Sequence, residues 1–525
     1  MLRQLSRFVI VIGALVAVST SARAERGNSD VQLDGQTIDM MVGDFMRDHD
    51  IPGMTLAIVQ APYISRLVGY GVSDIDKRLL ASPKTLWNVG QMTQAYTAVA
   101  VMQLVEAGKL SLDEPLDKHI SDLPEAWREI SLRQLMAHAS GLPDYSKQAM
   151  FQPAAEYRPE EVIALVKDLP LTSLPGTRVA NSATDFFLLG LVIERASGMS
   201  YEEYIIRNQI ERLNLKNTCF ASGFAERKTE VEAKGGKHRK FLTDRPYIDP
   251  TEVAVGSTTT NGKSLVVPAN SQSGSFANGA VWASAEDISL WDIGLAGNML
   301  INKKENRDFL FHAVKLGDGS ATPSHCGWRF LGHKGAMDIR GDVPGFSCHL
   351  SRFTDPSELL CVTLCCNKGG VELSELARRI AGAFDRKIAP PVSPQLMKCM
   401  ESAYSAKATA DRLVDAFQSQ GVGLSTRISL NTNAAKAGSE LPLTEQLTFE
   451  STEVRLQLML RNPLASMTLQ TTILVWQEPS GEVWLGTRDT TEAAAASGIN
   501  GEGEALQQIE NETEAAMAYA AGACL

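Results

Sequence analysis

A serine that acts as a nucleophile needs a neighbouring base, because its hydroxyl is a weak nucleophile at its own pKa. No serine of this chain has a lysine three residues later, and the tripeptide Tyr-x-Asn occurs nowhere. Cys365 and Lys368 have the spacing Cys-x-x-Lys, but they fall at the end of a predicted strand and not at the start of a helix. We attribute that spacing to chance. The sequence therefore holds no standard pair of serine nucleophile and lysine base.

The chain is organised around the stretch from Trp87 to Pro115, WNVGQMTQAYTAVAVMQLVEAGKLSLDEP. A short extended segment, 86–89, runs through Gly90 into a helix that ends at Gly108, a residue type that commonly terminates helices. Apolar residues recur near helical spacing along it, at Ala95, Val99, Met102, Leu104 and Val105. This pattern predicts a buried helix that presents its N-terminal turn to a pocket.

Further motifs follow one another along the chain. They are VEAGKLSLDEP (105–115), LMAHASGLPDY (135–145), PGTRVANSATDFFLLG (175–190), NGAVWASAEDISLW (278–291), and GHKGA with VPGFS (332–336 and 343–347). In order and spacing they resemble the serine β-lactamase and penicillin-binding-protein superfamily, in its branch of class C β-lactamases, esterases and D-Ala-D-Ala carboxypeptidases. The resemblance covers about residues 30–388. It implies an α+β, β-lactamase/transpeptidase-like fold, with an antiparallel sheet flanked by helices and a helical subdomain.

The resemblance also implies acyl transfer, but the positions that would carry it are changed. The family's helix opens with Ser-x-x-Lys, and these two positions hold Gln91 and Gln94. The family's Tyr-x-Asn positions hold Asn181 and Ala183, so that only the middle Ser182 is retained. Losing one member of a cooperating catalytic set typically costs on the order of 10⁴ to 10⁶ in rate. We therefore expect no catalytic residues at these degenerate positions.

The pocket itself could persist without the reaction. The resemblance implies a ligand pocket formed by Gln91, Gln94, Asn181, Ser182, His333, Lys334, Gly335 and Ala336. In that comparison His333 replaces the cationic residue of a strand motif and Gly335 is its glycine. The backbone N–H groups of Gln91 and Ala336 would form the oxyanion hole. The expected ligand is a peptidoglycan-like peptide or a small acyl or carboxylate compound, with no metal or other cofactor; the alternative is a vestigial pocket filled by its own side chains.

Three functions are consistent with these residues. The first is a non-catalytic binding or regulatory protein related to cell-wall peptide hydrolases. The second is an active hydrolase, an esterase, peptidase or β-lactamase-like enzyme, that uses non-standard residues such as Ser182 and His333. The third places the function in the C-terminal part, with the large domain as a scaffold. Whether the chain is an enzyme is therefore left open, with an inactive serine hydrolase homologue as the preferred interpretation.

Three other motif residues are interpreted as structural. His138 and Ser140 resemble a catalytic pair in type, but the resemblance assigns their segment to a helix end and a turn that shape the pocket floor. Asp287 follows Ser284 at the predicted start of a helix, where a carboxylate is favourable. We therefore expect Asp287 to stabilise that helix and not to act as an acid.

The N-terminus has the pattern of a cleavable secretory signal over residues 1–24. Arg3 and Arg7 precede the apolar run 8–18, and Ala22-Arg23-Ala24 supplies a small-x-small cleavage site. We expect a periplasmic or secreted protein without a transmembrane anchor after cleavage. The expected domains are 25–388, β-lactamase-like, and 389–525, a small α+β accessory domain of unknown type after a linker at 388–394.

Net charge and cysteine spacing indicate which partners are not expected. The net charge is -11 and the sequence pI about 5.4, and no long basic run exists, so nucleic acid is not an expected partner. The eight cysteines have no zinc-binding spacing, and we expect mostly buried thiols. Helices are expected over 36–52, 373–384 and 396–420, with a weak helix at the C-terminus. Strands are expected over 54–60, 64–71, 359–366, 424–430, 454–460, 469–477 and 483–487.

Overall fold

The computed structural model describes residues 30–61, 63–224, 252–260, 263–317, 319–330, 336–353, 360–389, 397–432, 442–461, 463, 466, 469–478, 481–490, 493–494, 499 and 503–522. The expected signal peptide and the site residues His333, Lys334 and Gly335 lie outside these ranges. A search of the described helices finds none that is long and apolar enough to cross a bilayer.

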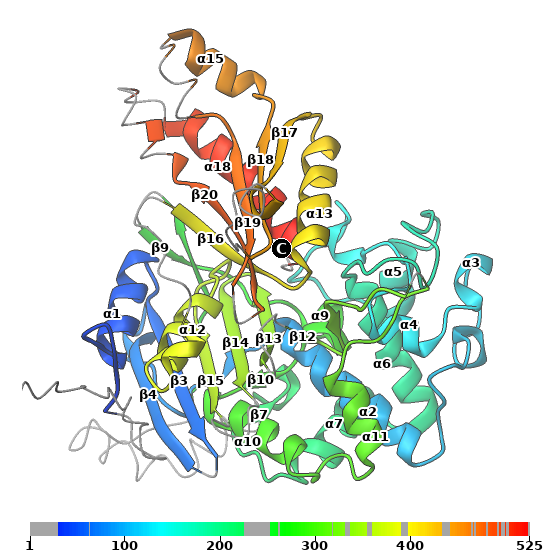
Figure 1. The fold of residues 1–525 in the computed structure, drawn as a ribbon. Coiled ribbons are helices and arrows are strands. Elements are labelled where there is room, and N and C mark those ends of the chain that lie inside the picture. The colour runs from blue at the N-terminus through cyan, green and yellow to red at the C-terminus, as the bar shows by residue number, and fades with distance from the viewer. Residues whose placement is uncertain are drawn as a thin grey trace, which may run out of the picture.

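An eight-stranded antiparallel sheet forms the centre of the large domain (Figure 1), in the order β11-β12-β13-β14-β15-β3-β4-β5. Its strands are β3 (Gly53–Gln60), β4 (Tyr63–Asp74), β5 (Leu79–Leu80), β11 (Ser324–His325), β12 (Trp328–Phe330), β13 (Ala336–Val343), β14 (Phe346–Phe353) and β15 (Leu360–Cys366). The strands β3 and β15 are buried along their whole length, which explains their nearly continuous apolar sequences. The strands expected over 54–60, 64–71 and 359–366 are confirmed.

Helices cover both faces of this sheet. On one face, α1 (Ile38–Asp48) and α12 (Ser374–Gly382) pack together over an apolar cluster that includes Met41, Leu56 and Val362. On the other face, α10 (Ala285–Ala296) packs against β3 and β15. Asp287 in the first turn of α10 accepts hydrogen bonds from the backbone N–H of Asn217 at 2.7 Å and from the Thr218 hydroxyl. Its structural interpretation is confirmed.

The remaining helices form a helical part beside the sheet. They are α2 (Thr93–Glu106), α3 (Glu125–Arg128), α4 (Leu132–Met136), α5 (Pro159–Ala164), α6 (Ala183–Ser197), α7 (Tyr201–Ile205), α9 (Gln272–Gly279) and α11 (Lys304–Phe311). Single turns are η1 (Gly90–Met92), η2 (Leu116–Lys118), η3 (Tyr145–Lys147), the π-helical η4 (Ile206–Ile210), η5 (Ala221–Gly223) and η6 (Arg386–Ile388). Short strands are β1 (Gln32–Leu33), β2 (Gln36–Thr37), β6 (Trp87–Asn88), β7 (Thr218–Cys219), β8 (Ser257–Thr260), β9 (Lys263–Val266) and β10 (Trp282–Ala283).

Helix α2 is the helix that the sequence predicts, and nearly all of its residues are buried. It packs against α6 and α9, and η1 forms its first turn. Gly90 and Gly108 both have positive φ, +51° and +68°, as a sharp entry and a helix end require. The Thr93 hydroxyl accepts a hydrogen bond from the Val281 backbone N–H at 3.1 Å. Thr93 is fully buried and therefore faces the core, as the sequence predicts.

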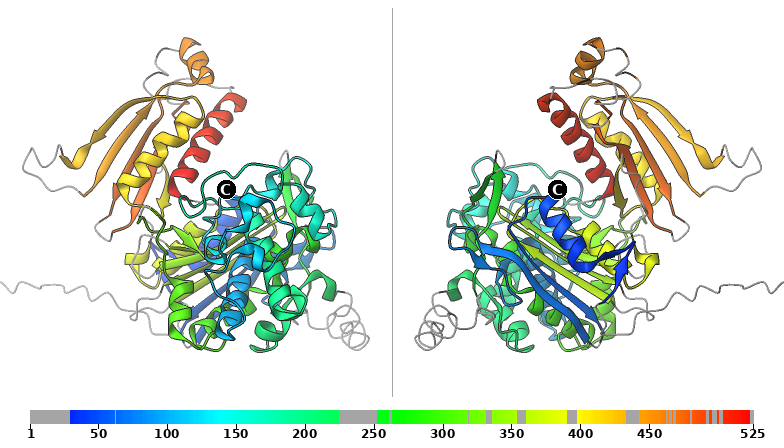
Figure 2. Two further views of the ribbon diagram at one scale, coloured as in Figure 1. Left: turned by 90° about the vertical axis from the view of Figure 1, so that its right-hand side faces the viewer. Right: turned by 90° about the vertical axis from the view of Figure 1, so that its left-hand side faces the viewer.

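The C-terminal part has its own antiparallel sheet, in the order β16-β20-β19-β18-β17. Its strands are β16 (Met397–Ser402), β17 (Leu424–Ser429), β18 (Thr444–Phe449), β19 (Thr472–Gln477) and β20 (Val483–Arg488), and its helices are α13 (Ala406–Ser419), α15 (Glu453–Arg461) and α18 (Gly503–Ala521). Figure 2 shows α13 and α18 side by side on one face of this sheet. Their contact buries Leu413, Phe417 and Met517 against Phe449 and Val475.

Two expectations for this part are wrong. The single helix over 396–420 is a strand, β16, followed by α13, because residues 397–402 pair with β20. The strand over 454–460 is the helix α15. Apolar residues alternate along it at Val454, Leu456, Leu458 and Leu460, which is a pattern typical of a strand. Of these four, only Leu458 is fully buried, while Leu460 is 77% exposed. The sequence analysis also missed β18.

The two parts are joined by a buried ion cluster. Arg378 on α12 forms ion pairs with Glu401 on β16 and with Glu482, next to β20, at 3.0 Å to the latter. Its guanidinium also lies over the ring of Trp484, 4.9 Å from the centroid. At a second point, Arg178 contacts Tyr519 near the end of α18. The C-terminal part therefore touches both the large sheet domain and the loop that carries Asn181.

Candidate ligand pocket

A pocket of about 260 Å³ lies where the start of α2 meets the outer edge of β13. The described residues that line it are Gln91, Gln94, His138, Asn181, Ser324, Gly327, Arg329, Arg340, Gly341, Asp342, Cys348, His349, Gly370, Val371, Glu372 and Leu373. Three residues that the sequence predicts for the pocket, Gln91, Gln94 and Asn181, are thus brought together. They come from η1, α2 and the loop before α6.

Gln91 connects the helix start to the strand. Its side-chain Oε1 accepts a hydrogen bond from the backbone N–H of Asp342 at 2.7 Å. The strand can come this close because residue 341 is glycine: a Cβ there would lie 1.7 Å from the carbonyl oxygen of Val89. The amide oxygen of Gln91 therefore occupies the backbone donor of β13 that faces the helix start.

The position of Ala336 corrects the sequence analysis. Ala336 is the first residue of β13, opposite Phe353, and packs in the apolar cluster beneath α1 and α12. Asp342, six residues later, supplies the backbone N–H near Gln91 instead. The hairpin turn at Pro344-Gly345 sets this register, since it pairs Val343 with Phe346.

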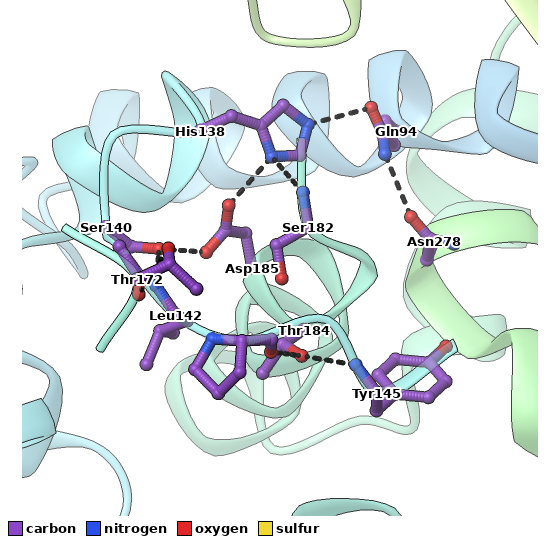
Figure 3. Close-up of polar contacts among 12 residues, drawn as sticks. Gln94, His138, Ser140, Leu142, Tyr145, Thr172, Ser182, Thr184, Asp185 and Asn278 are labelled. Atoms are coloured by element: carbon purple, nitrogen blue, oxygen red, sulfur yellow. Dashed lines mark hydrogen bonds and ion pairs between the residues drawn. The ribbon is translucent and has the colours of Figure 1, made fainter. Parts of the chain in front are cut away.

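Gln94 takes part in a buried chain of hydrogen bonds (Figure 3). Its Nε2 donates to Oδ1 of Asn278 at 2.8 Å, so its Oε1 faces His138 Nε2 at 3.3 Å. His138 Nδ1 lies 2.7 Å from Asp185 Oδ2, and the Ser140 hydroxyl donates to the other oxygen of Asp185. Each polar group in this chain has a partner, which makes the arrangement rigid.

This arrangement determines where protons are held. Because the Oε1 of Gln94 is an acceptor, the Nε2 of His138 carries a hydrogen in this assignment. The second ring nitrogen is engaged by Asp185, which is completely buried. Burial raises the pKa of the Asp185 carboxyl, and its contacts with His138 and Ser140 oppose that rise. His138 thus lines the pocket, consistent with the sequence analysis, which assigned its segment to the pocket floor, and neither of its nitrogens is a free base.

The segment 181–183 is divided between pocket and core. Asn181 is exposed and lines the pocket. Ser182 is buried, and its hydroxyl has no hydrogen-bond partner among the described residues; in Figure 3 it points away from His138. Ala183 begins α6 and belongs to the apolar core. The structure thus places Ser182 next to the pocket wall and not among the described residues that line it.

Charged residues from β12, β13 and the turn before α12 form the other wall. Arg329 donates to both oxygens of Asp338, and Arg340 forms an ion pair with Glu372. Burial raises the pKa of Asp338, but the two guanidiniums outweigh it and hold that pKa well below its usual range. His349 on β14 also lines this wall, and burial lowers its pKa to about 4. These residues come together only through strand pairing, so no local motif could have identified them.

No group of three or more histidine, cysteine, aspartate or glutamate side chains that could hold a metal ion is found in the described ranges. The side chains that line the pocket include amides, imidazoles, guanidiniums and carboxylates. Their combined chemistry suits recognition of a polar organic ligand.

Comparison with known proteins agrees with this geometry. A family model described as Beta-lactamase matches residues 38–382, and one described as Domain of unknown function DUF302 matches residues 398–520. Protein flp of Staphylococcus aureus (strain MW2) is 29% identical over 189 residues, which are 35% of this chain and 38% of that relative. The match thus spans about two fifths of the relative's length.

Solved structures share the fold at low sequence identity. The octameric penicillin-binding protein homologue from Pyrococcus abyssi superimposes with a TM-score of 0.56 at 19% identity, covering 85% of this chain and 99% of that one. D-amino acid amidase from Ochrobactrum anthropi SV3, complexed with L-phenylalanine amide, gives 0.54 at 18%, covering 67% and 99%. The Beta-lactamase family model matches well over half of the residues of this chain, so this chain belongs to the Beta-lactamase family.

Proposed function

We propose that this protein is an exported, non-catalytic member of its family, whose pocket binds a carbonyl- or carboxylate-bearing ligand such as a peptidoglycan-like peptide. The observation that carries the proposal is the hydrogen bond from the Asp342 backbone N–H to the side chain of Gln91. In the reaction implied by the family resemblance, backbone donors at this place would stabilise a substrate oxygen. Here the amide oxygen of the chain itself holds that donor.

The position of the expected base supports the same proposal. Gln94 is fixed between Asn278 and His138, and a carboxamide does not take up a proton near neutral pH. His138 cannot replace it, since both ring nitrogens are engaged. With nucleophile and base positions both occupied by amides, acyl transfer by the family mechanism has no residue to begin it.

Binding remains chemically reasonable. With its Oε1 anchored on Asp342, Gln91 can offer its Nε2 hydrogens to a ligand oxygen, and Asn181 lies at the same pocket. Amide groups bind carbonyl, carboxylate and peptide groups without a net charge. A stem-peptide fragment carries several such groups. Export, which this function requires, rests on the pattern of residues 1–24.

A labelling experiment tests the absence of catalysis. The mature protein is incubated with a fluorescent penicillin and, separately, with a fluorophosphonate, and adducts are sought by mass spectrometry. The expected result is no covalent adduct. An adduct on any pocket residue would overturn the non-catalytic proposal. Calorimetric titration with diacetyl-L-lysyl-D-alanyl-D-alanine tests binding, and no heat of binding at millimolar concentrations would overturn that part.

The alternative of an active hydrolase is tested by the same adduct map. Ser182 is a poor nucleophile in this structure, because its hydroxyl is buried and directed away from His138. An adduct on Ser182 would nevertheless identify it. Deleting residues 389–525 and repeating the titration separates the large domain from the C-terminal part as the site of function.

A further inference from the structure

Two neighbouring polar groups in the pocket wall lack hydrogen-bond partners. His349 is 1% exposed, and neither of its ring nitrogens makes a hydrogen bond to the described residues. Arg340 lies directly opposite it on β13, so both side chains project from the same face of the sheet. The Nε of Arg340 is also buried and makes no hydrogen bond within the described ranges; its ion pair with Asp338, at 3.8 Å, is too long for one. Both residues line the pocket.

Unsatisfied buried donors and acceptors are costly, typically about 1–3 kcal/mol each. Such groups are rare in native structures and call for a partner, such as a ligand. Here one orphan group is a fixed donor, the guanidinium N–H. The other is a neutral imidazole, kept uncharged by burial, which has one donor nitrogen and one acceptor nitrogen.

The surrounding charges determine which ligand group fits. Arg329 is paired with Asp338 and Arg340 with Glu372, so the cations on this wall are already matched by carboxylates. A ligand carboxylate would meet these two carboxylates as well as the guanidiniums, and it could not donate to the acceptor nitrogen of His349. A ligand ammonium group could not accept from Arg340. A neutral group that both accepts and donates a hydrogen bond would provide a partner for Arg340 and for His349.

We propose that His349 and Arg340 form a subsite for a neutral amide of the ligand, whose oxygen accepts from Arg340 Nε–H and whose N–H donates to the imidazole of His349. This inference deepens the proposed function and rests on it, since it assigns a ligand group to the same pocket. It predicts that the protein prefers an amide to a free carboxylate at this end of its ligand.

The test compares two small probes, N-acetylglycinamide and N-acetylglycine. The protein is labelled with ¹⁵N in histidine and glutamine side chains, and both probes are titrated by NMR. The His349 signals are assigned through His349→Phe, and those of Gln91 and Gln94 through their alanine variants. We expect N-acetylglycinamide to shift the His349 ring nitrogens and to bind roughly tenfold more tightly than N-acetylglycine, which is the effect of about one hydrogen bond.

Matched variants separate recognition from folding. Arg340→Lys keeps the positive charge beside Glu372 but removes the Nε–H, and should abolish the preference for the amide. His325→Phe removes another fully buried histidine, which is not among the residues that line the pocket, and should leave the preference unchanged. Circular dichroism verifies that each variant is folded.

The two proposals fail in different ways. Equal or tighter binding of N-acetylglycine, or shifts confined to Gln91 and Gln94, overturns the amide subsite and leaves the proposed binding function intact. Shifts confined to His349 support the subsite and contradict ligand contact at the helix start. Titrations in which neither set of signals moves overturn both.

Discussion

The side-chain oxygen of Gln91 lies 2.7 Å from the backbone nitrogen of Asp342, so the helix start and the strand edge are joined by a hydrogen bond within the pocket. Gln91 stands at the position where the family resemblance implies a nucleophile, and its side-chain oxygen also occupies a backbone N–H of β13. A single substitution at position 91 would therefore remove one obstacle to catalysis and leave the others.

Restoring all three family positions should restore reactivity. We expect the triple variant Gln91→Ser, Gln94→Lys, Asn181→Tyr to form a covalent adduct with a fluorescent penicillin, because the shorter side chain at 91 also releases the Asp342 N–H. Gln91→Ser alone should remain unlabelled, since nucleophile and base act as a unit. Gel fluorescence and peptide mapping provide the measurement. A folded triple variant that takes no label would show that the pocket has diverged further than these three side chains.

The close approach of β13 to the helix start should depend on Gly341. Gly341→Ala would place a Cβ 1.7 Å from the Val89 carbonyl oxygen, so the strand would have to move. We expect a loss of about 3 kcal/mol or more in the free energy of unfolding, measured with urea. Gly43→Ala on α1 is the control, since a Cβ there meets no atom within 4 Å. It should stabilise the protein by about 0.5–1 kcal/mol. Equal effects of the two substitutions would contradict the structure.

The sequence specifies α2 well because its signals are local. A glycine at each end and apolar residues at helical spacing define its bounds within a few residues. The register of β13 is different, since it depends on a hairpin turn eight residues after the motif that resembles the family's. Counting back from Pro344-Gly345 would have identified Gly341 and Asp342. His349 and Arg340 face each other only through strand pairing, which a single sequence does not reveal.

The acid stability of the protein should depend on His349. Burial lowers its pKa from an ordinary value of 6.5 to about 4, so the folded protein binds this proton less readily than the unfolded chain. The stability it contributes is complete above pH 6.5 and is lost as the pH falls toward 4, by about 3 kcal/mol in total. In urea unfolding between pH 7 and 4, His349→Phe should flatten the decline. His325→Phe should also flatten the decline, since burial lowers the pKa of His325 to about 3. An unchanged pH profile in both variants would contradict this linkage.

The contact between the two domains should depend on Arg378. This residue is 4% exposed and forms ion pairs with both Glu401 and Glu482. Arg378→Ala removes the cation that both ion pairs share, and removing one member of a buried ion pair typically costs about 3–5 kcal/mol.

Calorimetry should then show the C-terminal part unfolding at a lower temperature than the large domain. Arg386→Ala is the matched control, because Arg386 forms an exposed ion pair with Asp34 within the large domain. Exposed pairs contribute about 0–1 kcal/mol, so this variant should unfold as the parent does. A single unshifted transition in Arg378→Ala would mean that the contact at Arg178 and Tyr519, and not the buried ion cluster, holds the domains together.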